Sequence, residues 1–542
     1  MSEPPRDPAA SLRHAISAAV RKLHAGIPEP SLERPPRPEL GDYSTNAAML
    51  AAPLVGSPPR EVAGALAAAI EPDLGGALER IEVAGPGFLN LRMSEGWFRD
   101  AARHIAERGP RFAAGAPASA KSILIEFVSA NPTGPLTVAG GRHAAYGDSL
   151  ARVLELAGHD VRREYYVNDA GGQIRLFGAS LAARMRDESV PEGGYEGDYV
   201  TELGARMAAE GIAADDAEAL SRRGVELMVE SIAATLERAR VRFDRWSSER
   251  ELHEAGAIEA AIEALREREL VYESEGATWL RTSDFGDDKD RVLVRSAGQP
   301  TYFAADIAYH RDKLERGAEL MIDVLGPDHH GYLGRMRAAV VALGAPPEAF
   351  EVAIMQLVNL LEGGERSQMS KRRGEFATLD ELIDDIGVDA ARFFLLQRSH
   401  DTALDIDLEL ARRQSSDNPV YYVQYAHARI RSLFRAAGLD APPLDGIEAP
   451  PKGSLEPAER ALVARLLEMP EQVARAAAKR EPHAIAAYAR DVAADFHGFY
   501  RDCRVVGAGP GLEPARFAVC GAAQTVIAAS LDLLGIEAPE EM

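Results

Sequence analysis

The stretch SANPTGPLTVAGGRHAAYGD at residues 129–148 decides the fold of this chain. An apolar run at residues 123–128 leads into it and predicts a buried strand, which the Pro-Thr-Gly-Pro turn at residues 132–135 ends. Gly140 and Gly141 then stand at the start of a predicted helix, where the backbone can approach a ligand closely. A strand, a glycine-rich turn and a helix in this order indicate a nucleotide site in a doubly wound α/β unit.

A second stretch, GGERSQMSKRRGEF at residues 363–376, strengthens the nucleotide interpretation. A Gly-Gly pair alone would also suit a tight turn that binds nothing. Here, however, Lys371, Arg372 and Arg373 stand beside flexible glycines, so a mobile loop can carry cations onto a polyphosphate. An ordinary solvated basic loop is the alternative for this stretch.

Length and composition exclude several classes of protein. A chain of 542 residues is too long for one core and predicts about three domains, and 46% hydrophobic residues without an apolar run near ~20 residues exclude a membrane span. The N-terminus lacks an apolar signal core, and two cysteines argue against a disulfide framework, so we expect a reducing cytoplasm. The formal net charge of −23 means that any nucleic acid must meet local basic patches.

The pattern along the chain predicts a multidomain α/β protein. Residues 1–112 combine an amphipathic helix with the strand-like IEVAGPGFLNLRM and predict a small α+β domain. A Rossmann-type unit is expected over residues 113–410, with an acidic, glycine-containing insertion at about 187–285. Residues 411–542 read as helical throughout, with Ala-rich runs, and predict a helical bundle.

Polar residues near the predicted carboxyl ends of strands are the candidates for substrate binding. Glu126 and Asn131 follow the first strand of the unit, where a carboxylate suits a guanidinium or an α-ammonium group. Tyr302 and Asp306 are four residues apart at the opening of a helical stretch and share one face. The alternatives are a turn-capping Asn, a structural Glu, a core Tyr and a surface Asp.

Two further groups of side chains have the composition of binding sites. His329 and His330 follow a strand-like run at the same sheet edge, and no further ligands with zinc spacing accompany them, which disfavours a metal. The helical run that starts at residue 419 is rich in tyrosine and arginine, which are the usual means of reading unpaired RNA bases. Some of these aromatic side chains are expected to belong to the core.

Six segments in one order resemble the arginyl-tRNA synthetases, a family of class I aminoacyl-tRNA synthetases. The segments are IEFVSANPTGPL at 125–136, REYYVNDAGGQI at 163–174, PTYFAADIAYHRDK at 300–313, DVLGPDHHGY at 323–332, QMSKRRGEF at 368–376 and SSDNPVYYVQYAHARI at 415–430. The amino-terminal region, which ends in AGPGFLNLRMS, is similar to the extra tRNA-facing domain of that family. The resemblance covers essentially the whole chain.

The resemblance implies an arginine–tRNA ligase that takes ATP and Mg²⁺ as a substrate complex and holds no tightly bound cofactor. Its implied partners are tRNA(Arg), arginine and ATP, and we expect a monomer that binds no membrane. The positions that match the family's arginine site are Glu126, Ser129, Asn131, Tyr302 and Asp306. Those that match its ATP site are Thr137, Gly140, Gly141, Gly326, His329, His330, Met369, Ser370 and Lys371. Lys371 and His143 are expected to act in catalysis, and Tyr422, Tyr425, Arg429 and Arg431 to bind tRNA.

The chain departs from the family pattern at its signature. Family members carry His-x-Gly-His where this chain has residues 137–140, Thr-Val-Ala-Gly, so both signature histidines are replaced. Gln368 stands in place of a lysine, His143 in place of a glycine and Pro327 in place of an alanine. Two other hypotheses therefore stay open, namely a catalytically impaired paralogue that binds tRNA or arginine in a regulatory role, and an adenylating enzyme with another acceptor. The helical carboxyl-terminal region argues against the latter.

Overall fold

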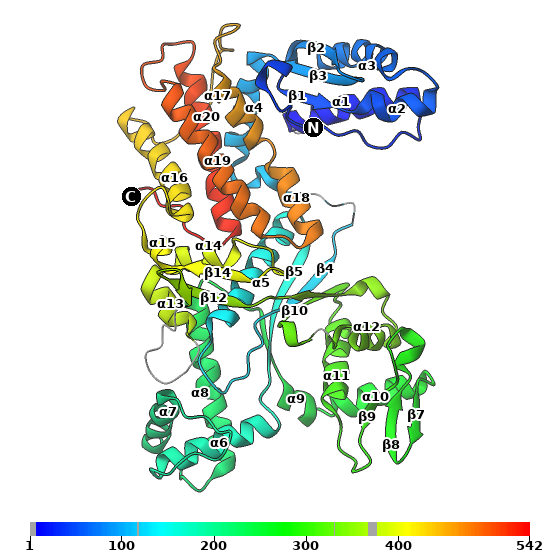
Figure 1. Cartoon of the computed structure of the whole chain (residues 1–542), viewed down its shortest axis with the longest axis vertical. Coiled ribbons are helices and arrows are strands. Elements are labelled where there is room, and N and C mark those ends of the chain that lie inside the picture. The colour runs from blue at the N-terminus through cyan, green and yellow to red at the C-terminus, as the bar shows by residue number, and fades with distance from the viewer. Residues whose placement is uncertain (1–6, 116, 118, 330, 367–376) are drawn as a thin grey trace.

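A parallel five-stranded sheet forms the centre of the molecule (Figure 1). The computed structural model describes residues 7–115, 117, 119–329, 331–366 and 377–542. In spatial order the strands are β11 (Phe350–Ile354), β10 (Leu320–Leu325), β4 (Ser122–Glu126), β5 (Asp160–Val167) and β6 (Arg245–Ser248). The chain winds from β4 to β6 in one direction and returns to β10 and β11 on the other side. The boundary between β4 and β10 is therefore the topological switch point, where doubly wound sheets bind ligands.

The predicted helix after the glycine-rich turn is α5 (Val138–Leu156), which connects β4 to β5 and packs on the sheet. The helix has no room for a side chain at Gly147, because a Cβ there would overlap the Phe127 ring. Phe127 is fully buried and packs against Phe243 at a ring distance of 4.4 Å. Close contact between α5 and the end of β4 therefore depends on the absence of a side chain at Gly147.

Two lobes are inserted between the strands of the sheet. The first follows β5 and contains α6 (Gly172–Met185), α7 (Asp198–Ala209) and α8 (Ala217–Arg238), with a hydrophobic core of its own. The second follows β6 and consists of α9 (Glu249–Glu254), α10 (Ala257–Glu267), β7 (Val271–Ser274), β8 (Ala277–Leu280), β9 (Arg291–Val294), α11 (Tyr302–Glu315) and, after β10, α12 (Leu333–Ala342). The insertion predicted at 187–285 is corrected accordingly: β6 lies within that range and pairs in parallel with β5 of the central sheet.

The amino-terminal region is an α+β unit, as the sequence predicts. Its antiparallel sheet has the order β1 (Tyr43–Thr45), β3 (Phe88–Met93) and β2 (Leu78–Ala84). Three helices cover that sheet, namely α1 (Pro8–Leu23), α2 (Ala47–Val55) and α3 (Pro59–Leu74). The chain then enters α4 (Glu95–Arg108), which leaves this unit and packs against the carboxyl-terminal helices (Figure 1).

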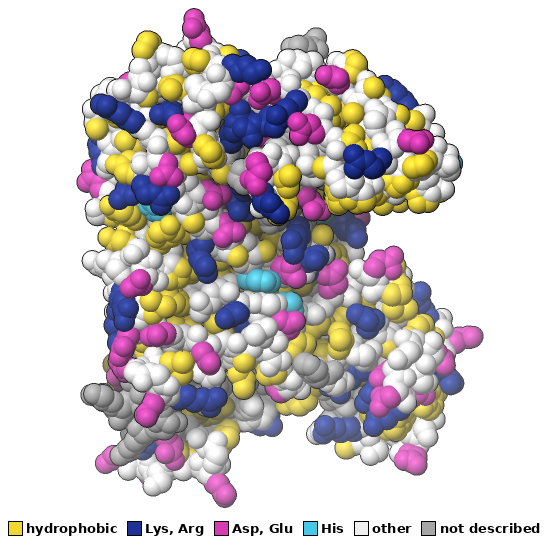
Figure 2. Space-filling view, turned by 45° about the horizontal axis from the view of Figure 1, so that its top comes forward, with side chains coloured by type: hydrophobic (Ala, Val, Ile, Leu, Met, Phe, Trp, Pro, Cys, Tyr) yellow, Lys and Arg dark blue, Asp and Glu magenta, His cyan; other side chains and the backbone are white. Residues whose placement is uncertain are grey.

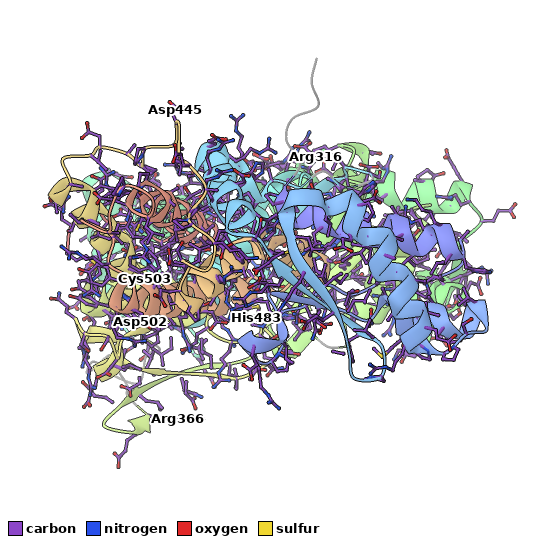
Figure 3. All side chains as sticks on the ribbon, turned by 90° about the horizontal axis from the view of Figure 1, so that it is seen from above. Arg316, Arg366, Asp445, His483, Asp502 and Cys503 are labelled. Carbon is purple, nitrogen blue, oxygen red and sulfur yellow. The ribbon has the colours of Figure 1, made fainter. Side chains whose placement is uncertain are left out.

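The carboxyl-terminal region is a bundle of helices, which confirms the predicted fold class. The bundle comprises α16 (Pro419–Ala436), α17 (Pro457–Leu466), α18 (Met469–Lys479), α19 (His483–Asp502) and α20 (Glu513–Leu533). Between sheet and bundle lie α13 (Leu379–Ile386), α14 (Val388–Leu396), α15 (Leu408–Arg412) and a small sheet of β13 (Glu365–Arg366), β12 (Val358–Glu362) and β14 (Leu404–Asp407). Both cysteines are free and buried, and Cys503 lies within the bundle (Figure 3). Over the described ranges, no helix has the length and apolar character needed to cross a bilayer.

We predict that Gly147→Ala lowers the free energy of unfolding by about 1–3 kcal/mol, because the new methyl group overpacks the Phe127 ring. Gly64→Ala is the matched control, since Gly64 lies on the exposed face of α3 with nothing within 4 Å of an added Cβ. That control is expected to raise the free energy of unfolding by up to about 1 kcal/mol. Urea denaturation followed by circular dichroism measures both, and equal stabilities of the two variants would contradict the packing argument.

Candidate active site

A cavity of about 510 Å³ opens at the carboxyl ends of β4 and β10. It brings together eight of the residues predicted from the sequence, which come from separate segments of the chain: Glu126, Ser129, Asn131, His143, Tyr302, Asp306, Gly326 and His329. This is the switch point of the sheet, so the site lies where the topology of the fold predicts a ligand.

A buried ion cluster forms the floor of the cavity. Glu126 and Asp323 are register partners on β4 and β10, and Lys313 of α11 donates to Glu126 Oε2 at 2.6 Å and to Asp323 Oδ1 at 2.8 Å. Burial and the neighbouring Asp323 raise the pKa of Glu126, whereas Lys313 and His310 hold the pKa of Asp323 well below its usual range. The Glu126 carboxylate therefore has a partner within the protein, so it is not a free ligand for a substrate cation.

The turn after β4 has a strained backbone. Val128 and Ser129 have φ angles of 69° and 39°, in the left-handed region that a β-branched residue rarely adopts. The turn directs the Ser129 hydroxyl to Glu126 Oε1, at 2.9 Å, and the same hydroxyl oxygen accepts from the Tyr166 amide at 3.1 Å. Strain of this kind persists only where the surrounding structure fixes it, and here the two hydrogen bonds of Ser129 help to do so.

Helix α11 presents Tyr302 and Asp306 to the cavity, as their spacing predicts. Tyr302 is 65% exposed, which rules out the alternative of a core Tyr. Burial raises the pKa of Asp306, while a hydrogen bond from Tyr332 lowers it. The helix is anchored below by His310, whose Nε2 lies 2.9 Å from Asp323 Oδ2.

Glu249 is a candidate that the sequence analysis missed. It is the first residue of α9, directly after β6, and it is 4% exposed. Burial, followed by the nearby Asp306 and Asp169, raises the pKa of Glu249 to about 7. The signal that could have identified Glu249 is its position directly after a strand. That strand, β6, lies within the insertion predicted at about 187–285, so the position was not considered. Asp306 and Glu249 are thus two neighbouring carboxyl groups beside the cavity, each with a raised pKa.

A second cavity of about 540 Å³ adjoins the first and shares Tyr302 with it. Its lining includes Glu249, His253 and three arginines, Arg175, Arg250 and Arg295. Tyr302 therefore lies between the first cavity, which contains Asp306, and the second, which contains Glu249 and the three arginines. Figure 2 shows the molecule hollowed between the amino-terminal unit and the α10–α12 lobe, with basic and acidic side chains interspersed over this face.

The predicted nucleotide residues of the glycine-rich turn lie elsewhere. Thr137, Gly140 and Gly141 are not among the described residues that line the cavity. The Thr137 hydroxyl accepts from the Gly140 amide at 3.3 Å and caps α5, and a Cβ at Gly141 would lie 2.6 Å from Leu379 Cδ1. In this structure Gly141 therefore allows α5 to pack closely on α13, instead of leaving space for a ligand.

His143 does line the cavity, but as an uncharged ring. Burial, followed by the adjacent Arg142, lowers the pKa of His143 to about 4, and its hydrogen bond to the Val324 carbonyl opposes that shift. A neutral imidazole has one N–H, which here is donated to that carbonyl. The other ring nitrogen is then an acceptor, so His143 is not a donor to a phosphate in this state.

Four predicted nucleotide residues, His330, Met369, Ser370 and Lys371, lie outside the described residues. The chain that follows them is described, and Thr378 forms an isolated antiparallel bridge with Thr137 at the start of α5. Val138 also donates to the Ala377 carbonyl, at 3.0 Å. The described chain that follows the second stretch thus meets the first stretch at the start of α5.

The predicted RNA-binding residues of α16 differ in their partners: Arg429 and Tyr425 contact aromatic side chains, whereas Arg431 contacts the end of the chain and the loop after α16. Arg429 lies between two tyrosine rings, 4.4 Å from the centroid of Tyr425 and 4.6 Å from that of Tyr500, and it donates to the Tyr425 hydroxyl at 2.7 Å. Tyr422 is half-buried and packs against His497 of α19. Arg431 donates instead to the Asp440 carbonyl at 3.0 Å and to Glu540 at 3.3 Å, so it is engaged within the bundle.

Comparisons with known proteins agree with these observations along the whole chain. Models of the arginyl-tRNA synthetase N-terminal domain, the class I (R) tRNA synthetase catalytic domain and the DALR anticodon-binding domain match residues 10–93, 111–430 and 423–542. Two relatives named arginine–tRNA ligase, from Heliobacterium modesticaldum and Frankia alni, are 43% and 45% identical; the alignments cover 98% and 99% of this chain and 99% and 100% of the relatives.

A solved structure gives the same result in three dimensions. The arginyl-tRNA synthetase of Thermus thermophilus is 25% identical, with a TM-score of 0.76, and the match covers 98% of this chain and 100% of that one. Sequence order, sheet topology and the three matched regions thus agree, and this chain belongs to the arginyl-tRNA synthetase family.

Proposed function

We propose that this chain activates arginine with ATP and transfers it to tRNA, as an arginine–tRNA ligase. The observation that carries the proposal is the pair of acidic groups, Asp306 and Glu249, beside the exposed Tyr302 ring at the switch point of the sheet. In a member of this family, that arrangement suits a planar cation that stacks on a ring and meets two carboxylates.

The reaction has two steps. A carboxylate oxygen of arginine attacks the α-phosphorus of ATP, and the bond from that phosphorus to the bridging oxygen breaks, which gives arginyl-adenylate and pyrophosphate. A terminal ribose hydroxyl of tRNA then attacks the carbonyl carbon, loses its proton, and releases AMP. The protein contributes alignment and stabilisation of charge on the phosphates, to which Mg²⁺ arrives with ATP as part of the substrate.

Arginine recognition is assigned to the α11 side of the cavity. Guanidinium matches two carboxylates in a plane, whereas the ammonium of lysine offers a single point charge. Asn131 and Ser129 border the same cavity. The Ser129 hydroxyl already donates to Glu126, and the Asn131 amide donates to Gln173, so we assign their oxygens to accepting from the α-ammonium group. Because Glu126 is already paired with Lys313, we assign it to holding Ser129 and the strand edge.

The tRNA is assigned to two places. The second cavity, with Arg175 and Arg295 near Tyr302, suits the phosphates of the acceptor end. The platform of Tyr425, Arg429 and Tyr500 suits an unpaired base. We retain the proposals of ATP with Mg²⁺ as substrate complex, a monomer and a cytoplasmic location, the last consistent with two free buried cysteines.

We predict that arginine binds more tightly as pH rises through about 7. Below that pH the Glu249 carboxyl is protonated, because its pKa is about 7, and it cannot pair with a guanidinium. Ionisation of Glu249 between pH 6 and pH 8 should lower the dissociation constant of arginine about tenfold, as measured by calorimetry. Glu249→Gln should remove most of this pH dependence.

The control for this experiment is His253→Gln, because His253 lies 3.8 Å from Glu249 and also faces the second cavity. That variant should keep the pH dependence. Asp306→Ala should abolish arginine binding, and lysine should not bind the unmodified chain. Equal affinity for lysine, or an unchanged pH profile in Glu249→Gln, would contradict the assignment.

We predict that the altered signature limits the rate. The variant Thr137→His/Ala139→Gly/Gly140→His restores two donors to the phosphates and should raise arginine-dependent adenylate formation by at least ~10²-fold. His143→Ala should lower the rate less than about tenfold, because the neutral ring already donates its only N–H to the Val324 carbonyl.

A single aminoacylation assay with radiolabelled arginine distinguishes the outcomes. A loss of 10² or more in His143→Ala would assign the missing donor to His143 instead. No turnover in either the unmodified chain or the triple variant would favour the catalytically impaired paralogue.

We predict that Arg429→Ala weakens tRNA binding by about tenfold or more, because it removes the side chain between the two tyrosine rings. Arg431→Ala is the matched control on the same helix and should have a smaller effect, since Glu540 already pairs with Arg431. Filter binding at two salt concentrations measures both, and affinity of the unmodified chain should fall steeply with salt. Equal losses in the two variants would contradict the platform.

A further inference from the structure

Residues 93–95 form the joint between the amino-terminal unit and the rest of the molecule. Strand β3 ends at Met93, and α4 begins at Glu95 and packs on the bundle. Ser94 caps α4 by accepting from the Trp97 amide at 3.2 Å. The direction in which the amino-terminal unit extends from the bundle, seen from above in Figure 3, is therefore set around residues 93–95.

One side chain of the bundle contacts both sides of this joint. Arg460 of α17 is 6% exposed and donates to Asp42 Oδ2 at 3.0 Å, to the Met93 carbonyl at 3.0 Å and to Glu95 Oε1 at 2.8 Å. Asp42 precedes β1 in the amino-terminal unit, and Glu95 is the first residue of α4. The rigid fork of a guanidinium fixes its acceptors relative to one another.

The acceptors are themselves held in place. Asp42 Oδ2 also accepts from the Met93 amide at 2.8 Å, and Glu95 Oε1 accepts from the Gly453 amide at 2.9 Å. The guanidinium lies 4.8 Å from the centroid of the Phe98 ring. Asp42 and Glu95 are both buried, so any rotation at the joint would separate buried charges, which is strongly unfavourable.

The other ion pairs described between this unit and the bundle are more exposed. They include Arg13 with Glu471 at 2.5 Å, Arg34 with Glu468 at 3.7 Å and Lys452 with Glu79 at 3.6 Å. Exposed pairs of this kind contribute little to a defined geometry, because solvent screens them and the side chains are mobile. Among the described residues, Arg460 therefore makes the buried ionic contact at the joint.

We infer that Arg460 is a positioning residue, which fixes the amino-terminal unit at the angle at which this unit and the bundle engage one tRNA together. The inference rests on the proposed function, because it requires tRNA as the shared ligand, and on the tRNA-facing role that the resemblance implies for the amino-terminal unit. Two surfaces that are held at the correct separation bind a ligand more tightly than the same surfaces on a loose joint, since the second contact becomes intramolecular.

The first test compares Arg460→Met with Asp42→Asn/Glu95→Gln/Arg460→Met. The single variant leaves two buried carboxylates without their partner and should lower Tm, whereas the triple variant removes all three charges and should recover Tm. Both should raise KM for tRNA about tenfold or more, with kcat and KM for arginine unchanged. Arg460→Lys keeps the charge without the fork and should give an intermediate KM.

A matched control is Arg516→Met, which breaks an equally buried pair inside the bundle. Arg516 donates to Glu459 at 2.8 and 3.0 Å and to the Arg504 carbonyl at 2.7 Å, all within the bundle region. It should lower Tm while KM for tRNA stays within about twofold. Recovery of KM together with Tm in the triple variant would overturn the inference, because Arg460 would then serve stability alone.

The second test measures the joint directly, without tRNA or catalysis. Spin labels at Leu54→Cys in α2 and Lys479→Cys in α18 occupy exposed positions, and both native cysteines are buried. Electron double resonance should give one narrow distance distribution in the unmodified chain and a broad one in both Arg460→Met variants. A narrow distribution in the triple variant would overturn the inference, as would a broad one with unchanged KM. Absence of charging in every variant, with broadening retained, would instead count against the proposed function.

Discussion

The site depends on the pairing of Lys313 with two carboxylates that the sheet places side by side. Glu126 and Asp323 are register partners on adjacent buried strands, where like charges repel strongly in a medium of low polarity. Lys313, fully buried, donates to both and has a raised pKa because of them. Loss of this one cation would leave two unpaired buried charges, at a cost of about 3–5 kcal/mol. The carboxyl edges of β4 and β10 are therefore held together by an ion cluster as well as by the sheet.

We assign the proposed selectivity for arginine to two acidic groups outside this cluster, Asp306 and Glu249. Lys313 belongs to α11, so the helix that neutralises the floor also carries Tyr302 and Asp306 above it. Burial raises the pKa of Asp306, and burial, followed by the nearby Asp306, raises the pKa of Glu249 to about 7. Under the proposed function, a guanidinium between the two carboxyl groups would relieve their mutual repulsion, and this relief would favour the binding of arginine.

Buried arginines join the distant parts of this acidic chain. Arg142, next to the signature turn, donates to the carbonyls of Gln356, Ser399 and Thr402 at 2.8 Å each. Arg392 links α14 to Asp148 of α5, at 2.6 Å, and to carbonyls near the ends of α8 and α20. Arg460 does the same at the amino-terminal joint. Each is a multidentate contact across segments far apart in sequence, which a point charge could not make.

The sequence by itself determined the family and the order of α+β unit, Rossmann-type sheet and helical bundle, because strand, turn and helix patterns are local. It also singled out eight residues that the fold brings to one cavity, because the motifs stand next to those patterns. It could not find Glu249, whose strand β6 is separated from β5 by three helices, nor the partners of Glu126 and Arg431. It also assigned Gly141 to a ligand, whereas the fold uses that glycine for helix packing. Only the tertiary structure decides which charges are already paired, because pairing and desolvation depend on neighbours that the chain brings together from a distance.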